Sequence, residues 1–349
     1  MALNNTQRNI CQKRILVLFF FLFIATGFGC AGTEAQMPAQ NSGSVQGSGM
    51  YANTGAARPE MAECWRELSV SLAGDGLDRE WVEDVFARLG SCYTDKPMKT
   101  KLSELYKIKF GKQKPAKEDA EKNRQALKNR YYRNVVTERN AKKAEAFLDE
   151  HMTVFQRVEE SSGVPKEIAV SLLLVETDLG SYMGKGRALT NLASMAASKK
   201  SSQFYPHLPT VKGDKEKEEW MRTILEKRSD WAYGELKALL EYSYVNRIDP
   251  LTLSGSIYGA IGYCQFMPSN VMKFGVDANN DGVIDLFDLH DAIASLSNYL
   301  KEAGWKIGLD EDGKRKVLLE YNRSIAYANT IIMMADKLKA RQRKHSAYI

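Results

Sequence analysis

Apolar residues recur at helical spacing along most of the chain, whereas the alternation typical of strands is scarce. The pattern predicts a helical pair over 58–111 with a Gly-Asp-Gly break at 74–76, and an amphipathic helix over 141–159. Between them, 112–145 is densely charged, and its few apolar residues fit one thin stripe on a solvated helix. Further helical segments are predicted at 217–228, 232–245, 290–303 and 325–343. We therefore expect a mainly α fold.

One helix differs from the others because it is apolar on every side. Pro165 can occupy its first turn, and the residues from Ile168 to Val175 are almost all apolar, which places this helix in the middle of a core. Glu176 ends the helix and Gly180 is a plausible terminator. A carboxyl group at the edge of a buried helix loses hydration, so its pKa rises toward the range of a general acid. The simpler alternative is a glutamate that turns outward at a helix end.

The first thirty residues predict export. Three basic side chains precede an apolar run at 15–24, and small residues follow it, so 1–30 reads as a secretory signal that is too short to span a bilayer comfortably. Gly29 and Cys30 resemble a bacterial lipobox, in which the cysteine would be lipidated; an ordinary cleavage site is the alternative. The polar, glycine- and serine-rich stretch 31–57 is typical of a flexible linker.

Composition narrows the class of protein. With 349 residues, 44% of them hydrophobic and 26% charged, the chain can bury one sizeable core or two unequal ones. The net charge of +6 is mild and acidic residues are interspersed, which favours an anionic polymer or surface over a nucleic acid as partner. In an exported protein Cys64 and Cys92 are a reasonable disulfide pair, and the absence of a Cys/His cluster argues against zinc.

Two segments are suited to binding a sugar. The run 256–269 is rich in glycine, tyrosine and amide or hydroxyl groups, and it includes Ser256, Tyr263 and Gln265. Sugars are bound by aromatic faces and directed hydrogen bonds, although a loop packed against a helix would have the same composition. In the second segment, Tyr321-Asn322 and Tyr327 are about two helical turns apart and could face one groove, but paired tyrosines are more often part of a core.

A third segment matches the calcium loop of an EF-hand. Asp277, Asn279, Asp281 and Asp285 stand at positions one, three, five and nine, with Gly282 at position six. Val283 would contribute its carbonyl oxygen, and Asp288 stands at position twelve in place of the bidentate glutamate, with Asp291 nearby to assist. A turn that binds no metal is the alternative.

These motifs follow one another in a specific order, which is Gly163-Val-Pro, Val175-Glu-Thr, Met183-Gly-Lys, the run from Gly259 to Ser269, the calcium-like loop and Tyr321-Asn. That order resembles the lytic murein transglycosylase B family from about Trp65 to the end, most strongly over 162–327. The chain departs from the family at Asp178-Leu179, where Arg-Trp is common, at Cys264, where Gly is usual, and in a longer basic excursion at 199–217.

The resemblance implies a lysozyme-like catalytic domain over 151–349 with an embedded calcium loop at 277–291, and an additional helical region over 58–150 that packs on it. Glu176 would be the only catalytic residue, and no catalytic cofactor is expected. The family's sugar contacts fall on Ser256, Gln265, Tyr299, Tyr321 and Tyr327, beside which Tyr263 and Asn322 are candidates. Structural calcium would be held by Asp277, Asn279, Asp281 and Val283, with Asp291 as the family's terminal carboxylate.

The expected reaction is cleavage of peptidoglycan glycan strands with formation of 1,6-anhydromuramic ends, by a periplasmic lipoprotein of the outer membrane. Other cell-wall enzymes are further conceivable partners. A hydrolysing muramidase on the same scaffold would need a positioned water and a second carboxylate. A noncatalytic, calcium-stabilised wall-binding lipoprotein is the alternative from another class.

Overall fold

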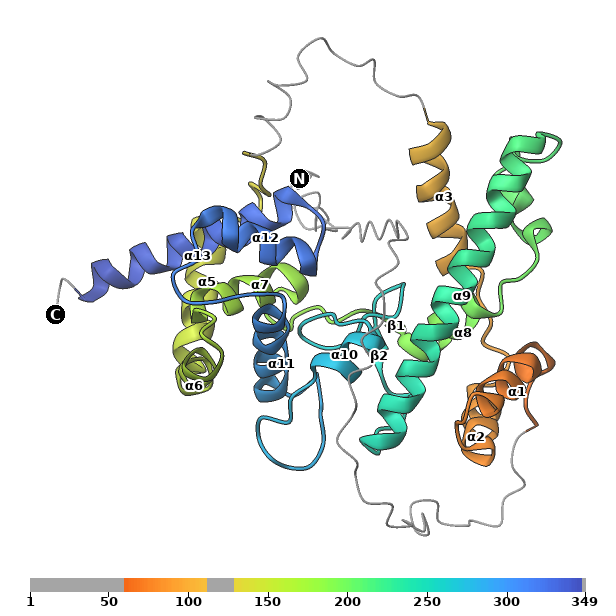
Figure 1. Cartoon of the computed structure of the whole chain (residues 1–349), viewed down its shortest axis with the longest axis horizontal. Helices are drawn as coiled ribbons and strands as arrows, with labels where there is room; N and C mark the ends of the chain where they lie inside the picture. Colours follow the sequence, from red (N-terminus) through yellow and green to blue (C-terminus); the bar gives the residue numbers. More distant parts are fainter. Residues whose placement is uncertain (1–59, 112–128, 347–349) are drawn as a thin grey trace, which may run out of the picture. The chain divides into compact units, whose positions relative to one another are not determined.

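The computed structural model describes residues 60–111 and 129–346 of the chain, and side chains as far as Arg343. The predicted signal at 1–30, the linker at 31–57 and half of the charged segment lie outside the described residues. Within the described ranges the chain is mainly helical, as expected, and no helix combines the length and apolar character needed to cross a bilayer (Figure 1).

The predicted N-terminal helical pair is confirmed, and a third helix follows it. The elements are η1 (Glu63–Trp65), α1 (Arg66–Gly74), α2 (Arg79–Leu89) and α3 (Lys96–Phe110). Asp78 caps α2 by accepting a hydrogen bond from the backbone N–H of Trp81. The indole of Trp65 donates to the carbonyl oxygen of Gly90 at 2.6 Å and closes the pair around its buried ring.

The amphipathic helix predicted over 141–159 is two helices, α5 (Glu138–Glu150) and α6 (Met152–Ser162). The break falls at His151, whose ψ of 24° leaves the helical range while its ring packs edge-on against Phe147 at 4.6 Å. The change of direction lets Leu148 of α5 and Phe155 of α6 both reach the core. An apolar period continues through such a break, so periodicity alone did not reveal it.

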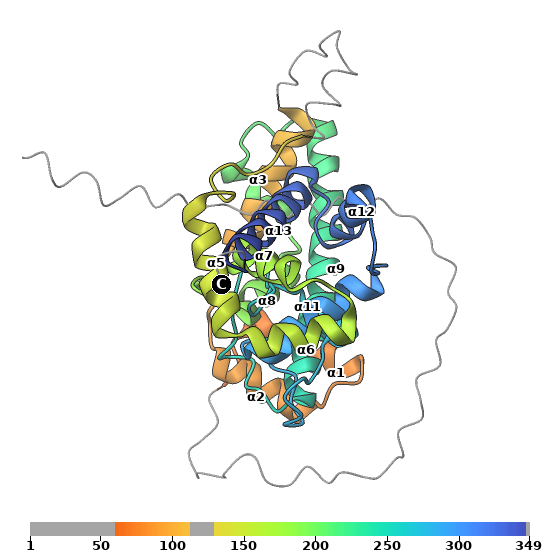
Figure 2. The same ribbon diagram turned by 90° about the vertical axis from the view of Figure 1, so that its left-hand side faces the viewer.

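The helix predicted to lie in the core does so. It is α7 (Lys166–Thr177), in which every residue from Glu167 onward is buried. Helices α5, α6, α11 (Leu289–Glu302) and α13 (Ile325–Ser346) all pack against it, and both ribbon views show it among them (Figure 2). Glu176 is thereby carried into the centre of the fold.

Two short strands connect the turn after α7 to the loop that begins near Ser254. Strand β1 (Gly186–Arg187) pairs antiparallel with β2 (Ser254–Gly255), in the register Gly186 to Gly255. Further bridges join Gly255 to Ile261 and Ile261 to Phe266. The sheet therefore holds two segments of the predicted family motifs side by side.

The remaining elements are α8 (Ala188–Ala196), η2 (Ser201–His207), α9 (Lys215–Val245), α10 (Pro268–Phe274) and α12 (Glu311–Tyr321). Helix α9 runs unbroken where two helices were predicted, because the residues between them include no Gly or Pro and Ser229 is buried in the helix. Helices α8, α10 and α12 were not predicted. Helices α8, α10 and α3 pack on α9.

Candidate active site

Glu176 lies in the last turn of α7 and is 4% exposed. The phenol of Tyr327, which is fully buried on α13, donates a hydrogen bond of 2.5 Å to Oε1 of Glu176. Burial raises the pKa of Glu176 to about 8, while the hydrogen bond from Tyr327 acts in the opposite direction. The carboxyl group therefore keeps its proton at neutral pH and can act as an acid.

The chain turns sharply directly after Glu176. Asp178 and Leu179 both have left-handed backbone conformations, with φ of 52° and 58°, so α7 ends at Thr177, three residues before the predicted terminator Gly180. Thr177 Oγ1 donates to the carbonyl oxygen of Tyr263 at 3.0 Å and accepts from the N–H of Gly180. The end of the helix is thus tied to the loop that contains Gln265.

Three of the predicted sugar-contacting tyrosines cluster beside Glu176. The rings of Tyr321 and Tyr327 stack with an interplanar angle of 9° at 6.3 Å, and Tyr299 meets Tyr321 edge-on at 5.0 Å. Each phenol already donates within the protein, Tyr321 to the carbonyl oxygen of Cys264 and Tyr299 to that of Glu320. Their hydroxyl groups therefore brace the site in this structure.

The loop before α10 is held in shape by its own polar groups. Ser256 Oγ accepts from the backbone N–H groups of Tyr258 and Ala260, at 3.3 and 3.0 Å. Gln265, at φ 49°, donates through Nε2 to the carbonyl oxygens of Gly262 at 3.0 Å and Met183 at 3.5 Å. Tyr263 and Gln265 both remain partly exposed. The polar groups of this loop thus lie against the turn that follows α7.

Asn322 follows α12 and lies between Tyr321 and Tyr327 in the chain. Its backbone is extended, its side chain is half-buried, and its carbonyl oxygen accepts from the N–H of Ser324 at 2.6 Å. It therefore belongs to the connection that turns α12 into α13.

Two polar residues outside the predicted set, Tyr132 and Glu235, are held by specific contacts. The hydroxyl of Tyr132 lies 3.5 Å from Ser324 Oγ, and its backbone N–H donates to the hydroxyl of Thr330 at 2.8 Å. Glu235 of α9 is buried, and its two oxygens accept from the backbone N–H and the hydroxyl of Ser269, at 3.0 and 2.9 Å. A glutamate on the apolar stripe of a predicted helix was the signal for the second residue, whereas Tyr132 lies in the charged segment interpreted as solvated.

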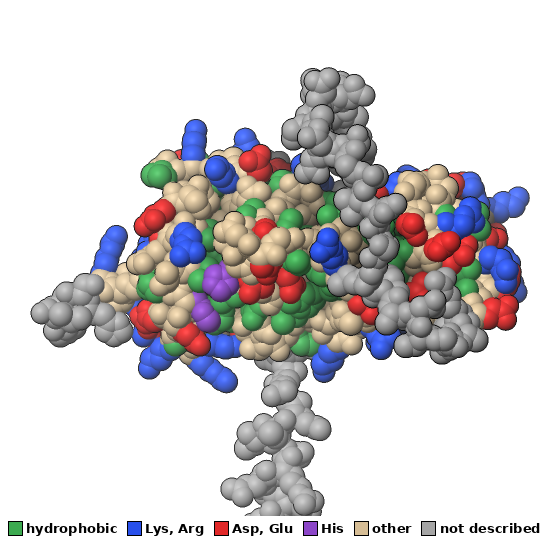
Figure 3. All heavy atoms as spheres, turned by 90° about the horizontal axis from the view of Figure 1, so that it is seen from below, with side chains coloured by type: hydrophobic (Ala, Val, Ile, Leu, Met, Phe, Trp, Pro, Cys, Tyr) green, Lys and Arg blue, Asp and Glu red, His purple; other side chains and the backbone are tan. Residues whose placement is uncertain are grey.

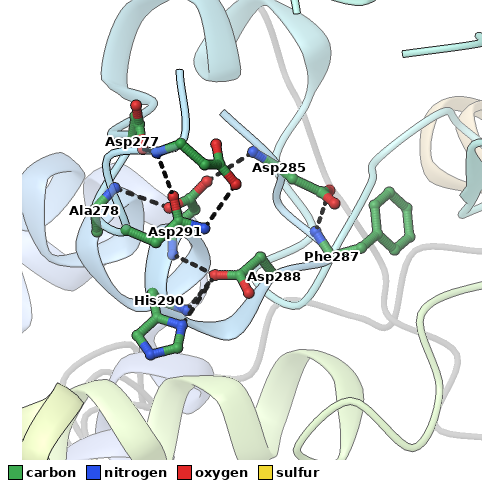
Figure 4. Close-up of polar contacts among 9 residues, drawn as sticks. Asp277, Ala278, Asp285, Phe287, Asp288, His290 and Asp291 are labelled. Atoms are coloured by element: carbon green, nitrogen blue, oxygen red, sulfur yellow. Dashed lines mark hydrogen bonds and ion pairs between the residues drawn. The ribbon is translucent and has the colours of Figure 1, made fainter. Parts of the chain in front are cut away.

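The calcium-like loop is organised by its own backbone (Figure 4). Asp277 accepts from the N–H groups of Asp281 and Gly282, and Asp281 from that of Val283. The buried Asp291 accepts from the N–H groups of Ala278 and Asp285, both at 2.8 Å. Among the described residues no three Asp, Glu, His or Cys side chains form a group that could hold a metal ion.

Asp288, predicted at position twelve of this loop, is the N-cap of α11. Its Oδ1 accepts from the N–H groups of His290 at 2.8 Å and Asp291 at 3.3 Å. Asp291, one helical turn further on, is the carboxylate that reaches the loop.

The disulfide predicted between Cys64 and Cys92 is not formed. Both are free thiols of exposed residues, and partial burial raises the pKa of the Cys64 thiol. Cys264 is a buried free thiol beneath the tyrosines, and burial raises its pKa strongly. The predicted lipidation site Cys30 lies outside the described residues.

The charged surface is mixed. Lysine and arginine side chains are spread across the face seen in Figure 3, with acidic side chains between them. A shallow hollow of about 640 Å³ is lined by Glu159, Lys166, Lys339 and Arg343 among others, at the opposite end of α7 from Glu176.

Comparisons with known proteins agree with the motifs. The membrane-bound lytic murein transglycosylase B of Escherichia coli K12 is 35% identical over 179 residues, which are 51% of this chain and 42% of that protein. The match thus spans less than half of the relative's length.

Among solved structures, the Escherichia coli lytic transglycosylase SLT35 in complex with calcium superposes with a TM-score of 0.59 at 20% identity, covering 84% of this chain and 99% of that one. For the soluble lytic transglycosylase SltB1 of Pseudomonas aeruginosa the TM-score is 0.58 at 21% identity, with 80% and 98% covered. These likenesses establish a shared fold. Residues 60–315 match the family model described as the transglycosylase SLT domain, which confirms the resemblance seen in the motifs: the chain belongs to this family.

Proposed function

We propose that this chain is a lytic transglycosylase that cleaves peptidoglycan between N-acetylmuramic acid and N-acetylglucosamine. The observation that carries the proposal is the buried carboxyl of Glu176, whose pKa is raised to about 8 and whose Oε1 is held by Tyr327. The family match and the name of the Escherichia coli relative support the same activity. SltB3 of Pseudomonas aeruginosa, with a TM-score of 0.55, is known in complex with a NAG-anhNAM-pentapeptide, which is the kind of product we expect here.

In the first half of the reaction, Glu176 gives its proton to the oxygen that links the two sugars. The bond between that oxygen and C1 of the muramic residue breaks, and the leaving strand departs with the proton. In the second half, the Glu176 carboxylate removes the proton from the muramic C6 hydroxyl as its oxygen attacks C1. The new bond closes a 1,6-anhydro ring, water is not consumed, and Glu176 regains its proton.

One carboxyl group is enough for both halves. Burial raises the pKa of Glu176 and the Tyr327 hydrogen bond lowers it in part, with no contribution from a neighbouring carboxylate. Glu235 is another buried carboxyl group, and both of its oxygens accept hydrogen bonds from Ser269. This arrangement favours the internal attack over the hydrolysing muramidase, which needs a second carboxylate to activate water.

The test is product analysis of purified murein sacculi digested with the protein. We expect anhydromuropeptides, each lighter by one water than the hydrolysis product, and loss of nearly all release in Glu176→Gln. Glu235→Gln is the matched control, since it alters another buried carboxyl and should preserve the anhydro product. Reducing ends in place of anhydro ends would instead identify a hydrolase, and no release at all would support a wall-binding role.

We also propose that the loop 277–291 binds a structural Ca²⁺. The oxygen donors of Asp277, Asn279, Asp281 and the Val283 carbonyl suit this hard cation, and Asp291 supplies a buried carboxylate already aimed at the loop backbone. The similar fold of SLT35 is known in complex with calcium. Calcium would supply stability, and no step of the reaction passes through it.

Finally, we propose that the protein is exported and anchored to the outer membrane through a lipid on Cys30, with 31–57 as a tether. In this arrangement the helical region 58–150 supports the catalytic region 151–349 beside the glycan layer. Radiolabelled palmitate should be incorporated into the wild type and not into Cys30→Ser, and the variant should leave the membrane fraction. An unlabelled wild type would indicate an ordinary cleavage site.

A further inference from the structure

The turn that follows Glu176 exposes an aromatic ring at a fixed place. Tyr182 is 49% exposed, yet its backbone N–H donates to the carbonyl oxygen of Thr177 at 2.9 Å. The left-handed residues Asp178 and Leu179 fold the chain back over the end of α7 to make this bond. The ring is thereby attached to the same helix end that carries the acid.

This turn is packed against the loop that contains Gln265. A Cβ atom on Gly180 would lie 2.1 Å from Cε1 of Tyr263, so the backbone of the turn touches that ring directly. The carbonyl oxygen of Met183, the residue next to Tyr182, accepts from Gln265 Nε2 at 3.5 Å. Tyr182 therefore lies in a turn that packs against the loop containing Tyr263 and Gln265.

Two lysine side chains also contact the turn. Lys143 of α5 donates to the carbonyl oxygen of Asp178 at 3.0 Å and pairs with the carboxylate of Asp178 at 2.7 Å. The ammonium of Lys185 lies 6.0 Å from the centroid of the Tyr182 ring, at the limit of a cation–π contact. The turn is consequently held from α5 while the ring of Tyr182 stays open to solvent.

A single exposed aromatic ring is ordinary on a protein surface, so exposure alone does not indicate a binding role for Tyr182. Its location beside the end of α7 is the relevant feature. Leu179, another large apolar residue of the turn, is buried. Tyr182 is thus the aromatic side chain that this turn presents to solvent. An amphipathic ring with little conformational freedom is well suited to stack on the apolar face of a sugar.

We propose that Tyr182 is a substrate-binding residue on whose ring an N-acetylated sugar of the glycan strand stacks, next to the bond that Glu176 cleaves. This inference deepens the proposed function and rests on it for the identity of the ligand. Because the ring binds the sugar in the ground state and in the transition state alike, Tyr182 should affect KM more than kcat.

The test measures binding without turnover, in a Glu176→Gln background, by calorimetry with a purified peptidoglycan tetrasaccharide that carries its stem peptides. We expect Tyr182→Ala to raise Kd about ten-fold and Tyr182→Trp to stay within about two-fold of the parent. Tyr182→Leu keeps apolar bulk without a ring face and should bind as weakly as Tyr182→Ala. Tyr244→Ala, which removes another half-exposed tyrosine on α9, is the control and should bind like the parent.

Binding by Tyr182→Ala or Tyr182→Leu that equals the parent would overturn the proposal, as would an equal loss in Tyr244→Ala. Equal melting temperatures of the Tyr182 variants exclude misfolding as the cause of weak binding. The proposed function fails in a different measurement, namely absence of anhydro products from the active wild type. The two failures are therefore distinguishable, because the calorimetric experiment requires no catalysis.

Discussion

Tyr327 and Glu176 are 151 residues apart in the chain, and the phenol of one donates to the carboxyl of the other across the contact between α13 and α7. A hydrogen bond donated to a carboxyl oxygen stabilises the charged form, whereas burial stabilises the neutral form. Burial and the Tyr327 hydrogen bond therefore favour opposite protonation states of Glu176. A residue that acts first as acid and then as base has to adopt both of these states.

Removing only this hydroxyl should disturb that balance. In Tyr327→Phe the charged form of Glu176 loses a donor, so the pKa of Glu176 rises further and the alkaline limb of the kcat/KM profile moves to higher pH. A hydrogen bond to a charged group is worth about 1.5–3 kcal/mol, so kcat should fall roughly ten- to hundred-fold. Tyr321→Phe, whose lost phenol donates to a carbonyl oxygen, should leave the limb in place. An identical shift in both variants would argue against a direct role of Tyr327.

The raised pKa of Glu176 also predicts how stability depends on pH. The folded pKa of about 8 lies above the ordinary value of 4.5, so the folded state binds more protons between these values. The contribution is complete below about pH 4.5 and is lost as the pH rises through about 8. Urea unfolding should therefore show the free energy of Glu176→Gln rising relative to wild type between about pH 5 and about pH 9, by a few kcal/mol. A constant difference would mean that Glu176 is charged throughout.

Gly180 should not tolerate a side chain, because a Cβ atom there would collide with the ring of Tyr263. Gly213 serves as the comparison, since a Cβ atom there would meet no other group. Both Gly180 and Gly213 have positive φ, 83° and 88°, but only at Gly180 would a Cβ meet another group, the ring of Tyr263 at 2.1 Å. Gly213→Ala should cost only the left-handed backbone, about 1–2 kcal/mol. Gly180→Ala should cost more in urea unfolding and should also lower turnover, since Tyr263 has to move. Equal costs in the two variants would show that the ring yields freely.

Part of the site could be predicted from the sequence, because the burial of α7 and the order of the motifs follow from local sequence patterns. The all-apolar helix from Ile168 to Val175 fixed the burial of α7, and with it the unusual environment of Glu176. The order of the motifs then located the Gln265 loop and the C-terminal tyrosines, which the structure brings together with Glu176.

What the sequence did not reveal depends on tertiary contacts. The interpretation of Tyr321 and Tyr327 as sugar contacts could not anticipate that their phenols bond to Cys264 and Glu176, because those bonds require α12 and α13 to pack on elements far away in the chain. The break at His151 was missed because an apolar period is the same on either side of a kink. Helix α9 is continuous where two helices were predicted, because the residues between them include no Gly or Pro. The role of Asp288 could not be predicted from the sequence either, because a side-chain carboxylate oxygen can cap a helix or bind calcium.

The terminal calcium ligand of the loop could be Asp291 or Asp288, and the last prediction distinguishes these two possibilities. If calcium binds as proposed, adding it at about a hundred times its Kd should raise the free energy of unfolding by about 2.7 kcal/mol, and a chelator should remove the gain. Asp291→Asn, which alters the buried carboxylate bonded to Ala278 and Asp285, should abolish the calcium-dependent rise in melting temperature. Asp288→Asn should keep it, because asparagine also caps a helix and Asp288 already serves α11. The reverse result, with the rise lost only in Asp288→Asn, would place Asp288 at position twelve of a conventional loop, and no rise in the wild type would show that the loop is a metal-free turn.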